Sequence, residues 1–183
     1  MNARAILRGR WQTYRQQNPD VRIRTAAQQL GVSEAELVQT SVDGPCVRLE
    51  PASVAMVTAF TALGKVMALT RSDALVHEVK AAFGEARRRD NRVTFLRPGQ
   101  DTRYFLNDWV FTFAVQEGER NSLQFFDRHG HAIHKVFLQA ESNLGAYQAL
   151  ISKYQLADQV SIIKVLPQIS ASRPLNPNRD VKA

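Results

Sequence analysis

Hydrophobic and polar positions begin this chain with a helical period. Ile6, Leu7, Trp11 and Tyr14 recur near helical spacing, and the turn-forming residues 18–20 end the segment. The next stretch, "IRTAAQQLGVSEAELVQ", predicts two further short helices. They are separated by a glycine turn, so the first forty residues are expected to be helical.

The second of these short helices has a clear start signal. Ser33 precedes it and Glu36 follows three residues later, which is the pattern of a capping box. Two short helices around a turn at Gly31 are also the signature of a helix-turn-helix motif. DNA binding by residues 21–40 is therefore one open hypothesis.

The period becomes strand-like after residue 45. Residues 45–50 predict a first strand and residues 51–63 a helix, whereas the stretch 84–92 is interpreted as a charged loop. The pattern "WVFTFAVQE" places Trp109, Phe111, Phe113 and Val115 on one face of a strand. The further strands are expected at 65–70, 74–80, 92–96, 109–117, 122–127 and 131–138.

These elements predict an α+β fold. A largely antiparallel β-sheet meander is packed with helices, one of them at about 143–155, and covered by helices on one face. The expected organisation is an N-terminal helical segment at 1–44 that packs on the sheet, an antiparallel sheet domain with helices at 45–166, and a Pro/Asn-rich linker or tail at 167–183.

Composition narrows the class of partners only slightly. The 183 residues carry a formal net charge of +7, which favours anionic partners such as nucleic acid, membrane headgroups or a small carboxylate ligand. The positive residues are spread along the chain, and the one dense run is Arg87–Arg88–Arg89 with Arg92 nearby. A diffuse basic surface does not select one of these partners.

The cysteine count and the apolar runs indicate a cytoplasmic location. Cys46 is the single cysteine, which excludes an internal disulfide framework and suits a reducing compartment. No apolar run approaches the roughly 20 residues that span a bilayer, and the N-terminus lacks the pattern of a secretory signal. We therefore expect a cytoplasmic protein without membrane insertion.

Three of the four histidines lie in "FFDRHGHAIHKVF", residues 125–137. His131 and His134 point to opposite sides of the predicted strand, so they cannot hold one metal ion together. A hairpin with a polar turn is the simpler interpretation. The fourth, His77, is either a hydrogen-bonded strand residue or a ligand to a porphyrin iron.

Sequence motifs of the common enzyme classes are missing. The chain contains no G-x-S-x-G, no phosphate-binding Walker loop, no G-x-G-x-x-G and no H-E-x-x-H. The residues alone therefore indicate an α+β binding domain.

Three stretches resemble a known family. They are "GKVMALTRSDALVHEVK" at 64–80, "TRYFLNDWVFTF" at 102–113 and "GERNSLQFFDRHGHAIHKVFL" at 118–138. With the helical opening, they resemble the hemin-degrading and heme-trafficking proteins of the HemS/ChuX type. The chain is similar to the first, N-terminal unit of the members that contain two such units.

The resemblance implies a fold and a ligand. The longer members clasp heme between parts of two units, and the shorter members have one unit and pair as dimers. A second copy or a second half of the fold is therefore the implied protein partner. Heme is the implied ligand or substrate, in binding and transfer or in degradation for heme-iron acquisition.

The resemblance also implies site residues. Arg103 matches the arginine that faces heme on the distal side, although it could instead pair with Asp101 or Asp108 on the surface. His77 is the histidine of this unit implied in heme contact and is our candidate iron ligand. His134 is a minor candidate for heme contact. The proximal histidine of the longer members lies beyond their linker, and this chain has no histidine after position 134.

Aromatic residues supply a flat apolar surface that suits a porphyrin. Phe137 belongs to this stripe, which is either ligand surface or core beneath the helices; the other members are Trp109, Phe111, Phe113 and Phe125. We therefore take Phe137 as a heme-contact candidate.

Two other function classes stay open. The predicted reader helix "SEAELVQTS" carries two glutamates and no basic residue, so phosphate repulsion argues against DNA binding at 21–40. The unit could also act purely in oligomerisation. Degradation would need an electron donor, and the sequence shows no flavin or nicotinamide motif, so we predict heme binding rather than a defined enzymatic step.

Overall fold

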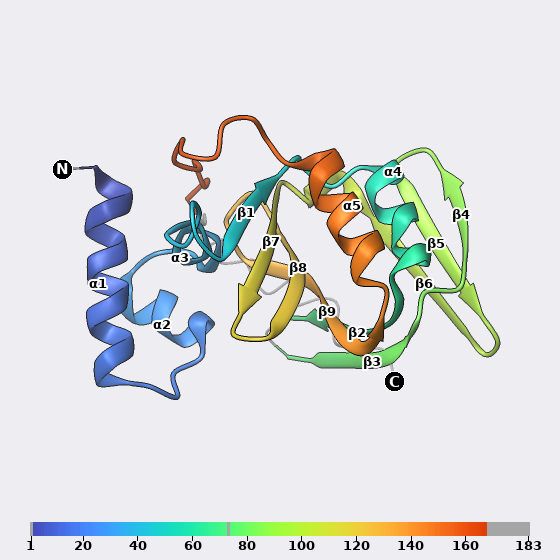
Figure 1. The fold of residues 1–183 in the computed structure, drawn as a ribbon, viewed down its shortest axis with the longest axis horizontal. Helices are drawn as coiled ribbons and strands as arrows, with labels where there is room; N and C mark the ends of the chain where they lie inside the picture. The colour runs from blue at the N-terminus through green and yellow to red at the C-terminus, as the bar shows by residue number, and fades with distance from the viewer. Residues whose placement is uncertain (1, 73, 168–183) are drawn as a thin grey trace, which may run out of the picture.

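The chain folds into two antiparallel sheets with helices around them (Figure 1). The computed structural model describes residues 2–72 and 74–167. The helices are α1 Ala3–Gln17, α2 Ile23–Leu30, α3 Glu34–Gln39, α4 Val54–Thr58 and α5 Leu144–Tyr154, with 3-10 turns η1 Ala59–Leu63 and η2 Leu106–Asp108. The strands are β1 Cys46–Leu49, β2 Gly64–Arg71, β3 Val76–Ala82, β4 Glu85–Arg89, β5 Arg92–Arg97, β6 Gln100–Phe105, β7 Phe111–Glu117, β8 Arg120–Phe126 and β9 Ala132–Ser142.

The larger sheet has six strands in the order β1-β7-β8-β9-β2-β3, and the smaller sheet has the order β4-β5-β6. Strands β3 and β4 follow each other through Gly84, so one segment forms an edge of both sheets. A Cβ atom at position 84 would lie 1.8 Å from the carbonyl oxygen of Leu96, so only glycine allows this close passage.

The main core lies between the two sheets and the helices α4, η1 and α5. Its centre is aromatic: the ring centroid of Phe60 lies 5.7 Å from that of Phe125 in the large sheet and 6.5 Å from that of Phe95 in the small sheet. Trp109 and Tyr147 are buried in the same core. Such offset and tilted ring pairs stabilise a core beyond their buried area.

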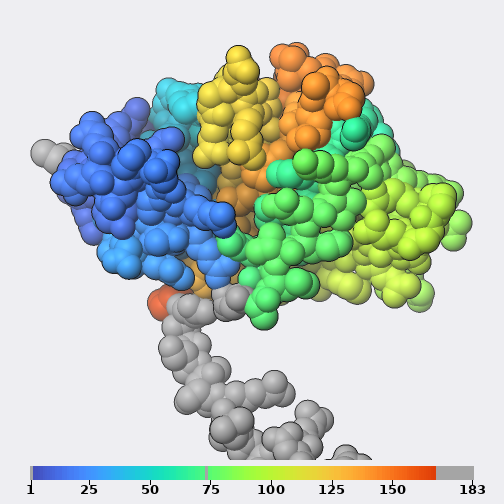
Figure 2. All heavy atoms as spheres, turned by 90° about the horizontal axis from the view of Figure 1, so that it is seen from below, coloured from blue at the N-terminus to red at the C-terminus, as the bar shows by residue number. Residues whose placement is uncertain are grey.

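The N-terminal helices form a separate layer at one end of the molecule, and the small sheet lies at the other end (Figures 1 and 2). The capping box of Ser33 and Glu36 is present, and Gly31 ends α2 in the left-handed conformation at φ 68°. Helix α3 packs its Ala35 and Val38 against Phe113 on the outer side of the large sheet. The predicted helices of the first forty residues and their caps are therefore confirmed.

The structure corrects three expectations about the strands. The stretch 84–92 is not a loop, because β4 and β5 pair from Glu85↔Leu96 to Arg89↔Arg92 and turn tightly at 90–91. Charged residues are tolerated there because β4 is an edge strand. Strand β6 was not anticipated, and it completes a second sheet where one sheet was expected.

The third correction concerns Trp109. Phe111, Phe113 and Val115 share the face beneath α3, but Trp109 precedes the strand and is buried in the main core instead. The 3-10 turn η2 ends at Asp108 and redirects the chain just before β7.

Helices also cover both sides of the large sheet, with α3 on one side and α4 and α5 on the other, where one covered face was expected. Within residues 2–72 and 74–167, no helix is both long enough and apolar enough to cross a membrane. The predicted tail at 167–183 lies outside the described residues except for Pro167, and the three-part division of the chain stays a prediction.

Candidate functional site

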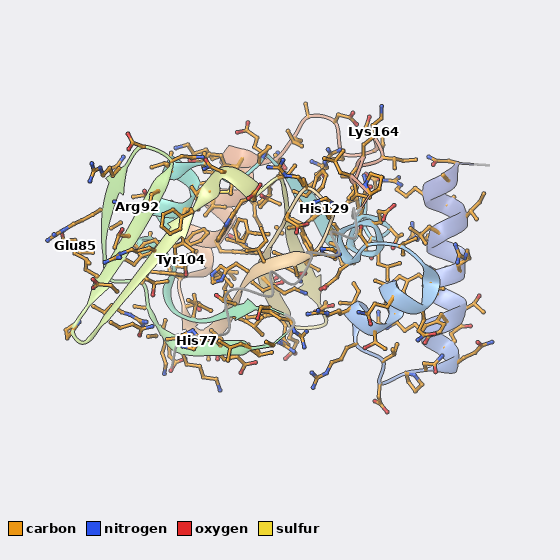
Figure 3. All side chains as sticks on the ribbon, turned by 180° about the vertical axis from the view of Figure 1, so that it is seen from behind. His77, Glu85, Arg92, Tyr104, His129 and Lys164 are labelled. Atoms are coloured by element: carbon orange, nitrogen blue, oxygen red, sulfur yellow. The ribbon has the colours of Figure 1, made fainter. Side chains whose placement is uncertain are left out.

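Arg103 lies on strand β6 and points away from the core. Its side chain is 60% exposed, and its Nη2 lies 3.9 Å from Oδ2 of Asp101, so the surface pairing considered from the sequence is present in a loose form. The neighbouring Tyr104 points inward, as strand alternation requires, and is buried (Figure 3). Arg103 therefore belongs to the outer side of the small sheet.

We call this side the outer face of the small sheet. Cross-strand pairing assigns nine side chains to it: Glu85, Arg87, Arg89, Arg92, Thr94, Leu96, Asp101, Arg103 and Phe105. Phe105 is 61% exposed, a large aromatic ring left uncovered beside four arginines. This face therefore combines one exposed aromatic ring with several guanidinium groups.

His134 lies in a different place, in the core between the sheets. It is 1% exposed, its Nδ1 lies 2.9 Å from Oγ1 of Thr70, and its Nε2 lies 3.3 Å from the hydroxyl oxygen of Tyr104. Burial lowers the pKa of His134 to about 3, with a smaller opposing effect from the backbone of Leu69. The imidazole is therefore neutral and hydrogen-bonded within the protein.

His77 and His134 both line a small cavity between the two sheets. Its volume is about 30 Å³, enough for about one water molecule and far below the volume of a ligand pocket. His77 itself is exposed on the edge strand β3 (Figure 3). Its role as an iron ligand stays a prediction.

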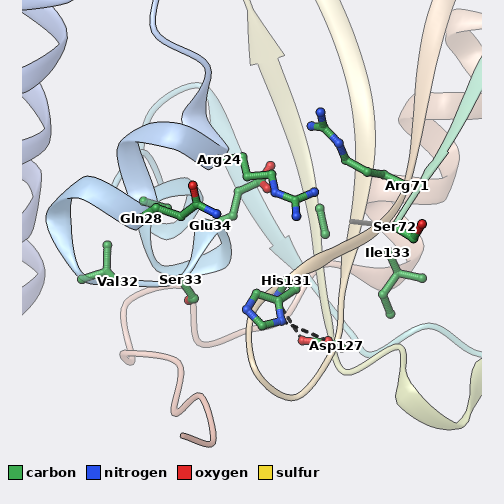
Figure 4. A pocket seen from close by; sticks show the side chains of 12 residues that line it. Arg24, Gln28, Val32, Ser33, Glu34, Arg71, Ser72, Asp127, His131 and Ile133 are labelled. Atoms are coloured by element: carbon green, nitrogen blue, oxygen red, sulfur yellow. Dashed lines mark hydrogen bonds and ion pairs between the residues drawn. The ribbon is translucent and has the colours of Figure 1, made fainter. Parts of the chain in front are cut away.

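Phe137 lies on the other side of the large sheet, near the N-terminal helices. Its ring is buried beneath the guanidinium of Arg120, whose central carbon is 4.7 Å from the ring centroid. It lines a hollow of about 890 Å³, and the adjoining cavity of about 560 Å³ contains the His131–Asp127 pair (Figure 4). This end of the molecule is opposite to the small sheet (Figure 2).

The structure thus distributes the four predicted site residues over three places. Arg103 is on the outer face of the small sheet and Phe137 is in the hollow near the helices, whereas His77 on the β3 edge and the buried His134 line the same small cavity between the sheets. The roles assigned to them stay predictions. For most of the aromatic stripe the core interpretation holds, because Trp109, Phe113 and Phe125 are buried in the two cores.

Phe105 was missed by the sequence reasoning. The signal that could have found it is its spacing of two residues from Arg103, which places both side chains on one face of a strand. That inference required recognising β6 as a strand.

The structure argues against DNA reading by α3. Its residues Glu34, Ala35, Leu37, Val38 and Gln39 are buried, whereas a recognition helix must expose its side chains to a groove. Glu34 forms an ion pair with Lys135 of β9 and is therefore tied to the sheet. Residues 21–40 serve as a packing layer.

Metal-site geometry is absent from the part of the chain that the structure describes, where no three His, Cys, Asp or Glu side chains converge. The histidine-rich stretch forms the predicted hairpin, β8–β9, with its turn at 128–130. The outer face of the small sheet contains no histidine. An iron ligand on that face would have to come from another segment or another unit.

Comparison with known proteins finds one family. The haemin-degrading HemS/ChuX domain matches residues 31–154. The chain is 34% identical over 142 residues to the hemin transport protein HemS of Yersinia enterocolitica, covering 75% of this chain and 41% of that protein. It is 30% identical over 169 residues to the hemin transport protein HmuS of Yersinia pestis, covering 90% of this chain and 48% of that protein.

A solved structure agrees in fold. The heme-binding protein PhuS of Pseudomonas aeruginosa, in its holo form, superposes with a TM-score of 0.84 at 35% identity, covering 91% of this chain and 50% of PhuS. The chain therefore spans about half the length of the relatives it matches.

Proposed function

The chain belongs to the haemin-degrading HemS/ChuX domain family, and from this premise we propose that it binds heme on the outer face of its small sheet. In this proposal the protein acts in heme-iron acquisition in the cytoplasm, where it holds heme and passes it on. The observation that carries the proposal is the exposure of Arg103 and Phe105 on one face, at alternate positions of strand β6.

The chemistry of this face suits heme. A porphyrin presents a flat apolar ring and two carboxylates, and the face presents an uncovered phenyl ring among guanidinium groups. Heme supplies the iron and the macrocycle when it is bound. Arg103 supplies a planar set of hydrogen-bond donors on one side of the ring, and Phe105 supplies apolar contact.

A flat face covers only one side of a flat ligand. Arg103 does not line any of the three cavities described above, so the second side of the ring needs a separate cover. We propose that this cover is a second unit of the same fold, in a longer chain or in a dimer. The relatives that are twice as long as this chain support the proposal.

Transfer is the favoured activity for this unit, and degradation is the alternative. Oxidative opening of the ring requires electrons from a donor. That donor is a separate molecule or a redox cofactor, and the sequence carries no flavin or nicotinamide motif. The proposal therefore covers binding and hand-over.

Hemin titration tests the proposal directly. Hemin added to the micromolar wild-type chain should give a saturable Soret band, and Arg103→Ala or Phe105→Ala should each weaken binding by about tenfold, as expected for the loss of one charged hydrogen-bond donor or one aromatic contact.

Arg88→Ala is the matched control. Arg88 belongs to the same arginine run and is exposed, but it lies on the opposite face of β4, so its loss should leave the affinity unchanged. A wild-type chain without a Soret band, or equal affinities in all variants, would refute the proposal.

A further inference from the structure

The arginine run of the sequence forms part of an ordered pattern on the outer face of the small sheet. Cross-strand pairing arranges the nine side chains in three rows. The first row lies at the β4–β5 turn, the second in the middle of the sheet, and the third at the far end. These rows are Arg89, Arg92 and Phe105, then Arg87, Thr94 and Arg103, then Glu85, Leu96 and Asp101.

The acidic side chains of this face are already engaged. Oε1 of Glu85 lies 3.1 Å from Nε of Arg87, and Oδ2 of Asp101 lies 3.9 Å from Nη2 of Arg103. Both acids of the third row thus face an arginine of the middle row. The charges of these two rows largely offset each other.

The first row has no such compensation. Arg89 and Arg92 are directly opposite each other across the two strands, an arrangement in which like charges repel. Asp90 lies between them in the turn at φ 50°, and within residues 2–72 and 74–167 neither arginine has a carboxylate within 4 Å. Two adjacent uncompensated guanidinium groups favour a bound anion with two acidic groups.

The ring next to this pair adds a second requirement. The guanidinium carbon of Arg92 lies 5.9 Å from the ring centroid of Phe105, which is the exposed aromatic residue of the face. A free phosphate would use the arginines but not the ring. A ligand with a flat apolar body and carboxylates at one edge would use both.

We infer that Arg89 and Arg92 bind the two propionate carboxylates of heme and thereby fix the orientation of the ring on the outer face; this inference rests on the proposed function. The row lies one strand repeat, about 7 Å, from the row of Arg103. Arg103 then faces the middle of the ring while Arg89 and Arg92 hold its acidic edge. The two arginines are specificity-determining residues for a dicarboxylate porphyrin.

Paired ligands test this inference. Hemin and hemin dimethyl ester, which lacks the two negative charges, are titrated into the full chain in the same buffer. Arg89→Gln/Arg92→Gln should weaken hemin binding at least about tenfold, since each charged hydrogen bond contributes that much. The same double variant should bind the ester as the wild-type chain does.

The controls separate the inference from the proposed function. Arg88→Gln, from the same run but the opposite face, should bind both ligands like the wild-type chain. If the wild-type chain binds hemin, Arg103→Ala weakens that binding and the double variant does not, the inference is wrong and the proposed function stands. If the wild-type chain binds neither ligand, both are wrong.

Discussion

The hydroxyl oxygen of Tyr104 lies 3.3 Å from Nε2 of His134, and this contact joins the small sheet to the large one. The two ring centroids are 5.0 Å apart, and Oγ1 of Thr70 approaches the other ring nitrogen at 2.9 Å. Both nitrogens of the imidazole thus have neutral partners in the core. A charged imidazole would be poorly solvated there, so the contact depends on a neutral histidine.

This burial predicts a specific pH dependence of stability. The folded pKa of His134 is about 3, below the ordinary value of 6.5, so the unfolded chain binds a proton between these values and the folded chain does not. The contribution of His134 is complete above pH 6.5 and declines as the pH falls toward 3, by about 1.4 kcal/mol per pH unit at most. Urea unfolding between pH 7.5 and 5 measures it.

Two variants isolate the effect. His134→Gln should show a shallower loss of stability on acidification than the wild-type chain, because glutamine does not titrate. Tyr104→Phe keeps the burial of the imidazole and should keep the steep loss. Parallel curves for wild-type and His134→Gln would contradict the assignment.

The pair of Lys135 and Glu34 should contribute strongly to stability. Both side chains are largely buried, at 13% and 7% exposure, where α3 meets β9. Lys135→Met leaves the carboxylate of Glu34 buried without its partner and should lower the free energy of unfolding by about 3 kcal/mol. Equilibrium urea denaturation provides the measurement.

The surface pair of Lys65 and Glu141 is the matched control, with side chains 50% and 59% exposed. Lys65→Met should change the free energy of unfolding by less than about 1 kcal/mol. Equal losses from the two lysine variants would show that burial does not govern the effect.

Gly130 should not tolerate a side chain. It has φ 76°, its carbonyl accepts a hydrogen bond from the amide of Ala35, and a Cβ atom would lie 2.3 Å from Oγ of Ser33. Gly130→Ala therefore combines left-handed strain with a clash against the cap of α3, and should lower stability by about 3 kcal/mol.

Gly118 serves as the comparison, because it has φ 60° but open space around its Cα. Gly118→Ala should cost about 1 kcal/mol, from backbone strain alone. Thermal melts of the two variants measure the difference. A similar loss of stability in both variants would show that the clash with Ser33 contributes nothing.

His77 and Arg103 lead to opposite expectations for heme. The side chain of Arg103 lies on the outer face of the small sheet, whereas His77 lies on β3 and lines the small cavity between the sheets. The proposal of heme binding on the outer face therefore predicts that His77→Ala retains the hemin affinity and Soret position of the wild-type chain, whereas the sequence-based prediction of His77 as the iron ligand predicts their loss. A Soret band lost in His77→Ala and kept in Arg103→Ala would instead identify His77 as the iron ligand.

Local signals predicted the helical layer well. The capping box at Ser33 and the left-handed Gly31 depend on a few neighbouring residues, and both are present as expected. The alternation that predicted β9 likewise has a local origin, and it placed His131 and His134 apart.

The second sheet could not be predicted from neighbouring residues alone, because it depends on pairing between strands. Strand β4 carries Arg87, Arg88 and Arg89, and charge alone favours a loop; only its pairing with β5 makes it a strand. The candidate binding face could not be predicted for the same reason. Arg103 and Phe105 share a face only because β6 pairs with β5.

The resemblance to a family identified the ligand, but not the distribution of the candidate residues. His134 and Phe137 are three positions apart in the sequence, yet one lies in the core between the sheets and the other beneath Arg120 on the far side. A sequence pattern gives the face of a strand. It does not give which layer covers that face.

The passage of β3 into β4 at Gly84 has a mechanical consequence. Because one uninterrupted backbone segment borders both sheets, neither border can detach without loosening the other. The small sheet and the β3 edge of the large sheet should therefore open as one cooperative unit in hydrogen exchange. Occupation of the arginine-rich end would then slow amide exchange along the whole shared border.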